Sequence, residues 1–190
     1  MNRCDWALGH PLLMAYHDEE WGVFTQNRQR LFELLILEGA QAGLSWLSIL
    51  KRRSAYRAAF LDFNPDKVAA WEESAVEPLL ENTGLIRNRA KLKAAWGNAR
   101  AFLLVEETFS GFDKYLLDMT GGPVIHHYET VAEVPAWDSL SQQLSRDLLQ
   151  RGFKFVGPTI CYSYLQATGL IMDHLISCFR YPVLGGKGCG

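Results

Sequence analysis

Apolar positions recur with a helical period along much of this 190-residue chain. Side chains three and four residues apart lie on one face of a helix, whereas strands show alternation. The clearest helical spacing follows Asn88 and comprises Leu92, Ala95-Trp96, Ala99 and Phe102-Leu103. It predicts a long helix over 89–106. Because alternating segments are weak throughout, the pattern as a whole predicts an all-α fold.

Capping residues indicate where the other helices begin. Asn, Ser and Asp side chains accept hydrogen bonds from the free N–H groups of a first helical turn, and Pro fits that turn well. These signals predict helices over 11–20, 28–42, 46–60, 139–150 and 158–168, a helix beginning at 65, and a last helix past Gly169 through Cys178. Gly43 is expected to end the second helix in a left-handed cap. The segment 120–123 is a break, and 124–134 reads as irregular or weakly extended.

Length and composition favour one domain. With 48% hydrophobic residues the chain can bury a sizeable core. We expect a single domain over 1–183 and a flexible tail at 184–190. No stretch resembles a membrane helix or a signal peptide, so a cytoplasmic location is expected. Its four cysteines are therefore better interpreted as ligands or free thiols than as disulfides. The net charge of −2 argues against a protein that coats nucleic acid, but not against a local DNA-binding patch.

A metal site is one interpretation of His174 and Cys178. On a helix these two positions share a face, and a tetrahedral structural site needs two further nitrogen or sulfur ligands. Cys4 and His17, near the start of the chain, can complete a Cys₂His₂ set. The alternative is a hydrogen-bonded core histidine beside a small core cysteine, because the spacing alone is a weak signal.

Two glutamates on the helix predicted over 28–42 face different ways. Glu38 falls on the face of Leu31, Leu34 and Leu35, whereas Glu33 falls on the opposite face and is expected at the surface. A carboxylate that points toward apolar surroundings is costly without a partner or a function. Glu38 is thus a candidate catalytic residue, or else a cap for the helix that begins at Ser45.

Aromatic residues gather near Glu38 in the sequence. They are Trp6, Tyr16, Trp21 and Trp46. Such residues usually belong to a core. Beside an inward carboxylate they also describe a slot for a flat cationic ligand, because aromatic faces stack on bases and attract positive charge.

A turn bounded by Gly152 and Gly157 precedes Pro158. Exposed backbone N–H groups at such a turn, followed by a helix N-terminus, suit a DNA phosphate, and Arg151 and Lys154 add positive charge. The alternative is an ordinary helix–helix connection. Basic groups elsewhere, such as 51–53, are expected to be solvated. The chain contains no phosphate-binding, dinucleotide-binding or serine-hydrolase motif.

These residues also carry a family resemblance. The chain resembles DNA-3-methyladenine glycosylase I in blocks that span nearly its whole length. The blocks are Arg3-Cys-x-Trp6, Ala15-Tyr-His-Asp-x-Glu-Trp-Gly22, Leu37-Glu-Gly-x-Gln-Ala-Gly-Leu-Ser-Trp46, Gly84-x-Ile-Arg-x-Arg89, Arg151-Gly-Phe-Lys-Phe-Val-Gly157 and Gly169-Leu-x-x-Asp-His174.

The resemblance implies a helix–hairpin–helix fold and a monofunctional enzyme that removes N3-methyladenine from double-stranded DNA by base flipping, releasing free 3-methyladenine and starting base excision repair. It implies a structural Zn²⁺ on Cys4, His17, His174 and Cys178, a base pocket of Trp6, Tyr16, Glu38 and Trp46 with Glu38 and Tyr16 catalytic, and a DNA-binding hairpin formed by Arg151, Gly152, Phe153, Lys154, Phe155, Val156 and Gly157. A monomer is expected.

One position departs from the bifunctional members of the wider superfamily. Those enzymes carry a lysine nucleophile two residues after the last hairpin glycine, where this chain has Thr159. Strand cleavage through a Schiff base is therefore not expected. The wider superfamily also uses an aspartate after the hairpin helix, but Asp173 is not assigned that catalytic role, because its neighbour His174 is expected to bind the metal. The rival interpretations are a zinc-stabilised helical module that binds DNA or protein, and a glycosylase for another alkylated purine.

Overall fold

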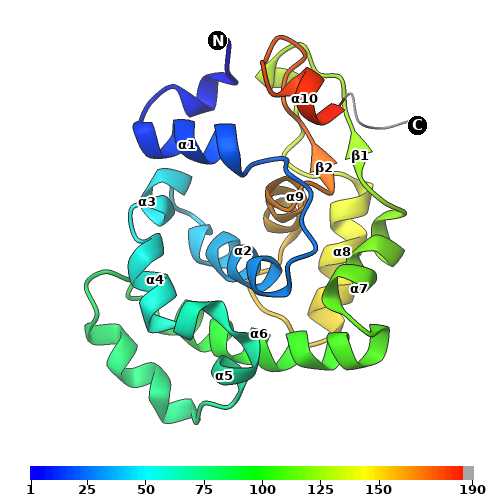
Figure 1. Ribbon diagram of the computed structural model, residues 1–190. Helices are drawn as coiled ribbons and strands as arrows, with labels where there is room; N and C mark the ends of the chain where they lie inside the picture. Colours follow the sequence, from blue (N-terminus) through cyan, green and yellow to red (C-terminus); the bar gives the residue numbers. More distant parts are fainter. Residues whose placement is uncertain (186–190) are drawn as a thin grey trace.

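The computed structural model describes residues 1–185, and most of them are helical (Figure 1). The elements are η1 (Asp5–Ala7), α1 (Pro11–Glu19), α2 (Arg28–Gln41), α3 (Trp46–Leu50), α4 (Arg53–Ala59), η2 (Leu61–Phe63), α5 (Pro65–Ala69), η3 (Glu73–Glu81), α6 (Arg89–Phe109), α7 (Phe112–Thr120), β1 (Val124–Ile125), η4 (Val131–Glu133), α8 (Ser139–Gln150), α9 (Pro158–Ala167), β2 (Ile171–Met172) and α10 (Tyr181–Gly185). The all-α prediction is confirmed. No helix within 1–185 combines the length and the apolar character needed to cross a bilayer.

The predicted caps are confirmed one by one. The side chains of Asn27, Ser45, Asn64, Asn88 and Asp138 each accept a hydrogen bond from the first turn of the helix that follows. These bonds satisfy N–H groups that would otherwise lack partners, so the helix starts could be predicted to within a residue. Gly43 has a φ of +77° after the end of α2, in agreement with the predicted left-handed cap.

Helix α2 lies at the centre of the core. It packs against α6, α7 and α9, and its residues 31–40 are buried on every side. This all-round burial makes the prediction of a surface Glu33 wrong. Glu33 is only 5% exposed, and its carboxylate pairs with Arg30, Arg53 and Arg57. The arginines allow the burial. Arg53, whose side chain is 12% exposed, is therefore not part of a solvated basic face, whereas Lys51 is exposed as expected.

Two other expectations are corrected. The helix predicted over 46–60 is split into α3 and α4 at Lys51 and Arg52. The helix predicted past Gly169 is a two-residue strand, β2, which pairs in parallel with β1 and leads into a turn that reaches Cys178. Gly169 has a φ of +72°, and a Cβ there would lie 2.2 Å from the Phe24 backbone nitrogen, so this position requires glycine.

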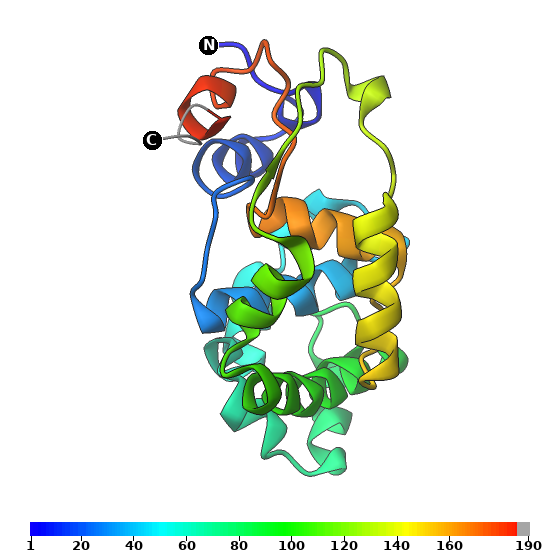
Figure 2. The same cartoon turned by 90° about the vertical axis from the view of Figure 1, so that its right-hand side faces the viewer.

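The two ends of the described chain lie together at one end of the molecule (Figure 2). The Asn2 carbonyl accepts a hydrogen bond from the Phe179 N–H, and the Asn2 side chain donates to the Ser177 carbonyl. Leu184 and Gly185, which we expected in the flexible tail, belong to α10. The rest of that tail lies outside the described residues.

Candidate active site and metal centre

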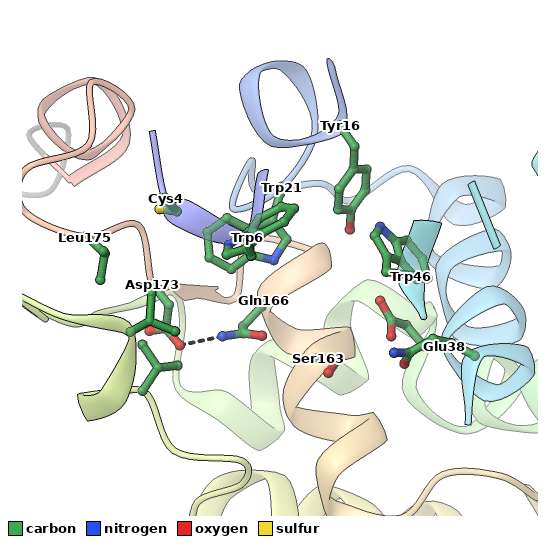
Figure 3. A pocket seen from close by; sticks show the side chains of 13 residues that line it. Cys4, Trp6, Tyr16, Trp21, Glu38, Trp46, Ser163, Gln166, Asp173 and Leu175 are labelled. Atoms are coloured by element: carbon green, nitrogen blue, oxygen red, sulfur yellow. Dashed lines mark hydrogen bonds between the residues drawn. The ribbon is translucent and has the colours of Figure 1, made fainter. Parts of the chain in front are cut away.

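A cavity of about 260 Å³ opens between the N-terminal segment, α2, α3 and α9 (Figure 3). Its lining joins parts of the chain that are far apart in sequence. The lining residues are Cys4, Trp6, Tyr16, Trp21, Glu38, Gln41, Trp46, Val131, Val134, Ser163, Gln166, Asp173 and Leu175. The four residues predicted to bind a base, Trp6, Tyr16, Glu38 and Trp46, all belong to this set. A concave apolar site with few polar groups is the usual form of a small-molecule pocket.

Glu38 is a buried carboxylate that lacks a protein partner. It lies near the end of α2 and is 3% exposed. Within residues 1–185 its oxygens make no hydrogen bond and no ion pair, so the alternative role as a cap at Ser45 is not supported. Burial raises the pKa of Glu38 to about 8, because a charge without partners is poorly solvated there. The site is thus prepared to gain from a ligand that supplies a positive charge or N–H donors.

The aromatic residues form a connected wall over this carboxylate. The rings of Trp6 and Trp21 meet edge to face at 5.0 Å, and those of Tyr16 and Trp46 lie 5.2 Å apart. Burial, with the nearby Glu38 charge, raises the pKa of Tyr16 far above its usual value, so its hydroxyl stays a proton donor. The indole Nε1 of Trp46 is buried without a partner in the described chain. These groups can stack on a flat ligand and hydrogen-bond its edge.

The opposite wall comes from α9 and from the residue after β2. Ser163 and Gln166 lie three residues apart on α9 and therefore share a face, and Asp173 lies beside them (Figure 3). Sequence reasoning did not assign Gln41, Ser163 or Gln166 to a site. The spacing of Ser163 and Gln166, two polar residues on a helix that is otherwise largely buried, is the signal that could have indicated this wall.

The four predicted metal ligands lie together in one buried cluster. Single ligand atoms of Cys4, His17, His174 and Cys178 are all within 4.8 Å of one another. The Cys178 sulfur lies 3.4 Å from His17 Nε2 and 3.5 Å from His174 Nδ1, and the Cys4 sulfur lies 3.8 Å from His174 Nδ1. The cluster can hold a metal ion. His174 and Cys178 meet through the turn after β2 and not through a shared helix face.

Hydrogen bonds on the far side of each histidine orient the rings. His17 Nδ1 lies 2.8 Å from Asp18 Oδ1, and His174 Nε2 lies 3.0 Å from the Trp21 carbonyl oxygen. Both acceptors favour a proton on the outer nitrogen, which leaves the inner nitrogen free as a ligand. Asp18 is itself held by three hydrogen bonds from Arg3.

The protonation of the cluster also fits a cation. Burial lowers the pKa of His174 to about 4, so the ring is neutral and able to bind a metal at pH 7. In the protein alone, burial raises the pKa of the Cys4 thiol to about 12. A positive ion between the sulfurs would reverse that effect, because a coordinated thiol loses its proton.

The metal cluster and the cavity share a wall. The ring of His17 lies 5.4 Å from the ring of Trp6, and the ring of His174 lies 4.6 Å from that of Trp21. The cluster therefore fixes the indoles that cover the cavity, although its ligand atoms do not face the carboxylate of Glu38.

The predicted hairpin is a rigid connection between α8 and α9. Phe153 and Val156 point into the core, whereas Gly152 and Lys154 are exposed. The buried Asn98 side chain binds both the N–H and the carbonyl of Lys154, at 2.9 and 3.0 Å. Gly152 adopts a φ of +90°, which favours glycine. The N–H groups of Phe155, Val156, Gly157 and Thr159 have no partner within 1–185, and they lie where α9 begins.

The two cations of the hairpin differ. Arg151 binds Asp147 at 2.6 Å and stacks over the rings of Phe109 and Tyr115. Lys154 is exposed and makes no ion pair in the described chain. The positive charge that is available at this surface is therefore that of Lys154, and Arg151 acts mainly in packing.

Comparison with known proteins agrees with this geometry. The sequence profile of the methyladenine glycosylase family matches residues 6–181. The chain belongs to this family. It is 48% identical over 183 residues to DNA-3-methyladenine glycosylase 1 of Escherichia coli (strain K12), covering 96% of this chain and 98% of that protein, and 40% identical to DNA-3-methyladenine glycosylase of Haemophilus influenzae, covering 93% and 96%. A solved structure from Staphylococcus aureus, described as showing the basis of 3-methyladenine recognition, has a TM-score of 0.91 at 39% identity and covers 96% of this chain and 97% of its own.

The methyladenine glycosylase fold thus brings the predicted base-binding set and the predicted metal ligands to one end of the molecule. No lysine is among the residues that line the cavity within 1–185. Thr159 lies exposed in the first turn of α9, on the helix face that it shares with Ser163 and Gln166, and a threonine has no amine with which to form a Schiff base. This arrangement agrees with the expectation that no Schiff base forms.

Proposed function

We propose that this protein is a monofunctional DNA glycosylase that hydrolyses the N-glycosidic bond of 3-methyladenine in double-stranded DNA and so starts base excision repair. The observation that supports it best is a buried Glu38, with no protein partner, under an aromatic wall. Relatives that are named for this activity span nearly the whole chain. A solved variant of one relative, with a TM-score of 0.92, is described as a complex with 3-methyladenine.

The cavity suits a cationic purine. Methylation at N3 gives adenine in DNA a positive charge, which weakens its glycosidic bond. Trp46 and Trp6 would stack on the extruded base, while Tyr16 and Glu38 would hydrogen-bond its edge. The bound cation would favour ionised Glu38 and lower its pKa from about 8. Neutral adenine offers no such charge and is a poorer leaving group, so selectivity follows.

Hydrolysis in this scheme needs no protein nucleophile. The bond between N9 and C1′ breaks, the base leaves neutral with the electron pair, and water forms the new bond to C1′ and releases a proton. The protein contributes by extruding the nucleotide, which costs a few kcal/mol, and by holding the base apart from the sugar. The exposed Thr159 and the lysine-free lining agree with this scheme.

The hairpin would hold the DNA backbone. Its free N–H groups lie at the N-terminus of α9, where a phosphate is favoured by hydrogen bonds and by the helix dipole. Lys154 would supply the charge. Because α9 also carries Ser163 and Gln166, the element that grips the phosphate would place the nucleotide relative to the cavity.

The metal would be a structural Zn²⁺. With Zn–S near 2.3 Å and Zn–N near 2.0 Å, a tetrahedral site separates sulfur from nitrogen by about 3.5 Å. The separations found here are 3.4, 3.5 and 3.8 Å. Four protein ligands leave no open position for substrate, so the ion would join the N- and C-terminal segments and support the indole wall.

Metal analysis and chelation test the zinc proposal. We expect about one Zn²⁺ per chain in the purified protein. Its removal, or Cys178→Ser, should lower the melting temperature and the excision rate together, because the ligands hold Trp6 and Trp21. Cys161→Ser is the matched control, since Cys161 is a buried cysteine outside the cluster. A metal-free protein with full stability and activity would contradict the proposal.

Release of bases from methylated DNA tests the activity itself. The protein is incubated with DNA treated with a methylating agent, and the released bases are separated by chromatography. We expect 3-methyladenine and an intact sugar–phosphate backbone. Release of another alkylated purine in its place would indicate a different glycosylase, and DNA binding without release would indicate a binding module.

Gel filtration in the same buffer tests the expected monomer, and cell fractionation tests the cytoplasmic location.

A further inference from the structure

The turn between η3 and α6 contains a sequence block that neither the cavity nor the metal cluster uses, Gly84-x-Ile-Arg-x-Arg89. This turn is held firmly against α4. The Ile86 N–H donates to Tyr56 Oη at 3.3 Å, and a Cβ at Gly84 would lie only 2.7 Å from the Cβ of Ala55. Because the packing is so close, the backbone of the turn is fixed, and the side chains that it exposes start from a defined position.

The cations of this turn and of the first turns of α6 differ in their partners. Arg89 and Lys93 each pair with an exposed glutamate. Lys91 donates to two backbone carbonyl oxygens at the end of α2. Arg87 is exposed and makes no hydrogen bond or ion pair within residues 1–185. The charge of Arg87 is therefore available to a ligand, as is that of Lys154 in the hairpin.

Helix α6 places Arg87 relative to the hairpin and the cavity. Near the middle of the helix, Asn98 binds the backbone N–H and carbonyl of Lys154 in the hairpin. Seven residues earlier, Lys91 binds the end of α2, which leads to the cavity residue Trp46. Arg87 lies just before the helix begins. Along α6, the segment that leads to the cavity is thus flanked by the hairpin on one side and by Arg87 on the other.

We propose that Arg87 binds a backbone phosphate of the DNA strand opposite the flipped nucleotide. This inference rests on the proposed glycosylase function. The hairpin would hold the strand that carries the lesion, and the fixed turn at 84–88 would hold the complementary strand. Helix α6 rises by about 14 Å from its start to Asn98, which is enough to span a groove of B-DNA that is about 6 Å wide on the minor side and about 12 Å on the major side.

The chemistry of the side chain suits this ligand. The planar guanidinium group of an arginine can donate two parallel hydrogen bonds to the oxygens of one phosphate. Contacts with the backbone fix the position of a protein on the duplex and carry no sequence information. Two such contacts, one on each strand, would keep the duplex in place while the nucleotide between them leaves the stack, a step that costs a few kcal/mol.

Uncharged methylphosphonate groups in place of single phosphates test the contact and identify its strand. The probe is a duplex with a stable abasic-site analogue, which the protein can bind but not process. Neutralising the contacted phosphate of the complementary strand should weaken binding by the unaltered protein by about 5- to 10-fold. Arg87→Met should lose as much on the fully charged duplex and nothing more on the neutralised one. Its slope of log affinity against log salt should be smaller by about 1.

Three further variants serve as controls. Lys154→Met should show the same pattern for a phosphate of the strand that carries the lesion. Arg87→Lys keeps the charge without the planar fork, so it should restore the salt slope but only part of the affinity. Lys114→Met removes the charge of an exposed lysine on α7, which makes no ion pair in the described chain, and it should leave the affinity and the salt slope unchanged.

Binding of free 3-methyladenine should be the same in Arg87→Met and in the unaltered protein, because Arg87 is not among the residues that line the cavity. A loss of that binding would show that the variant acts through the fold, and would overturn the proposal. So would an Arg87→Met protein that binds the duplex as Lys114→Met does, or one whose lost phosphate lies on the strand with the lesion. Failure of the unaltered protein to release 3-methyladenine would instead overturn the glycosylase function and would leave these binding measurements as they are.

Discussion

Helix α2 carries two buried glutamates, five residues apart, that the protein treats in opposite ways. Glu33 is 5% exposed and Glu38 is 3% exposed. Glu33 receives hydrogen bonds from Arg30, Arg53 and Arg57 at 2.7–2.8 Å. Glu38 receives none within the described chain, and its pKa rises to about 8. The two carboxylates are buried to the same degree, so they differ in the number of hydrogen-bond donors around them.

The comparison separates structure from function more clearly than burial does. A buried carboxylate with a full set of donors is part of the fold, and removing it leaves other charges without partners. A buried carboxylate without donors lowers stability, and such a cost is typical of binding sites. Other buried groups also keep one atom without a protein partner. The histidines of the metal cluster are each held through the outer ring nitrogen, which leaves the inner nitrogen free, and Oε1 of Gln166 has no donor within the described chain.

Of the variants that test this comparison, we expect Glu33→Gln to cause the largest loss of stability. Glu33→Gln should lower the free energy of unfolding by about 3–4 kcal/mol, because three arginines lose their shared counter-charge in a partly buried position. Chemical denaturation at pH 7 measures the change. Glu77→Gln is the control, since Glu77 pairs with Arg89 at the exposed surface and should leave the denaturation midpoint unchanged. Equal stability of Glu33→Gln and the unaltered protein would remove the distinction.

Removing the charge of Glu38 should instead raise the free energy of unfolding, by an amount that grows with pH. Its folded pKa, about 8, lies above the usual 4.5, so ionisation costs stability as the pH rises through 4.5–8. Below that window the carboxyl is neutral and Glu38→Gln should match the unaltered protein. At pH 7 the variant should be the more stable by about 3 kcal/mol, and by pH 9 by about 5 kcal/mol. Melting curves from pH 5 to pH 9 measure this, and a difference that does not vary with pH would contradict it.

Activity should divide the two glutamates as well. Glu38→Gln keeps the size of the side chain but removes both the charge that complements the methylated base in DNA and the carboxylate that accepts hydrogen bonds from the free base, so we expect release of 3-methyladenine and binding of the free base to fall by about 100-fold. Glu33→Gln, assayed well below its melting temperature, should retain the activity. Tryptophan fluorescence can follow binding of the free base, because Trp6, Trp21 and Trp46 line the cavity. Unchanged release by Glu38→Gln would remove the proposed role of Glu38.

The features that the sequence predicted well are set by neighbouring residues. Caps such as Asn27 and Asn88 satisfy N–H groups three residues away, so a short stretch of sequence is enough. Among the elements that were not predicted, η3 and α7 lack such side-chain caps, and η3 contains Pro78. A helix was predicted where the strand β2 lies, because the strand depends on pairing with β1, which is more than forty residues away in the sequence. Pairing over that distance leaves no local signal.

The site shows the same limit. Glu38 was correctly predicted to point inward from its position on the face of Leu31, Leu34 and Leu35. Glu33 was predicted at the surface, but it is buried. The arginine partners of Glu33 come from α4 as well as α2. The hydrophobic periodicity of α2 cannot predict contacts with side chains from another helix. The orientation of the Gln166 amide depends on Asp173, and that of Asp173 on His126 from the distant β1 segment. Such chains of contacts become visible only in three dimensions.

The smallest expected effect concerns the end of α2 that follows Glu38. Lys91 Nζ donates to the Ala40 and Ala42 carbonyl oxygens at 2.9 and 2.6 Å, and so satisfies the C-terminal turn that leads to the cavity residue Trp46. Lys91→Met should lower the free energy of unfolding by about 1 kcal/mol and slow base release a few-fold, because a cation at a helix C-terminus is lost and the turn loosens. Lys93→Met, two residues along α6, removes only an exposed pair with Glu73 and should change neither. If both variants behaved alike, the turn would be held by its own backbone, and Glu38 would owe its position to the packing of α2 alone.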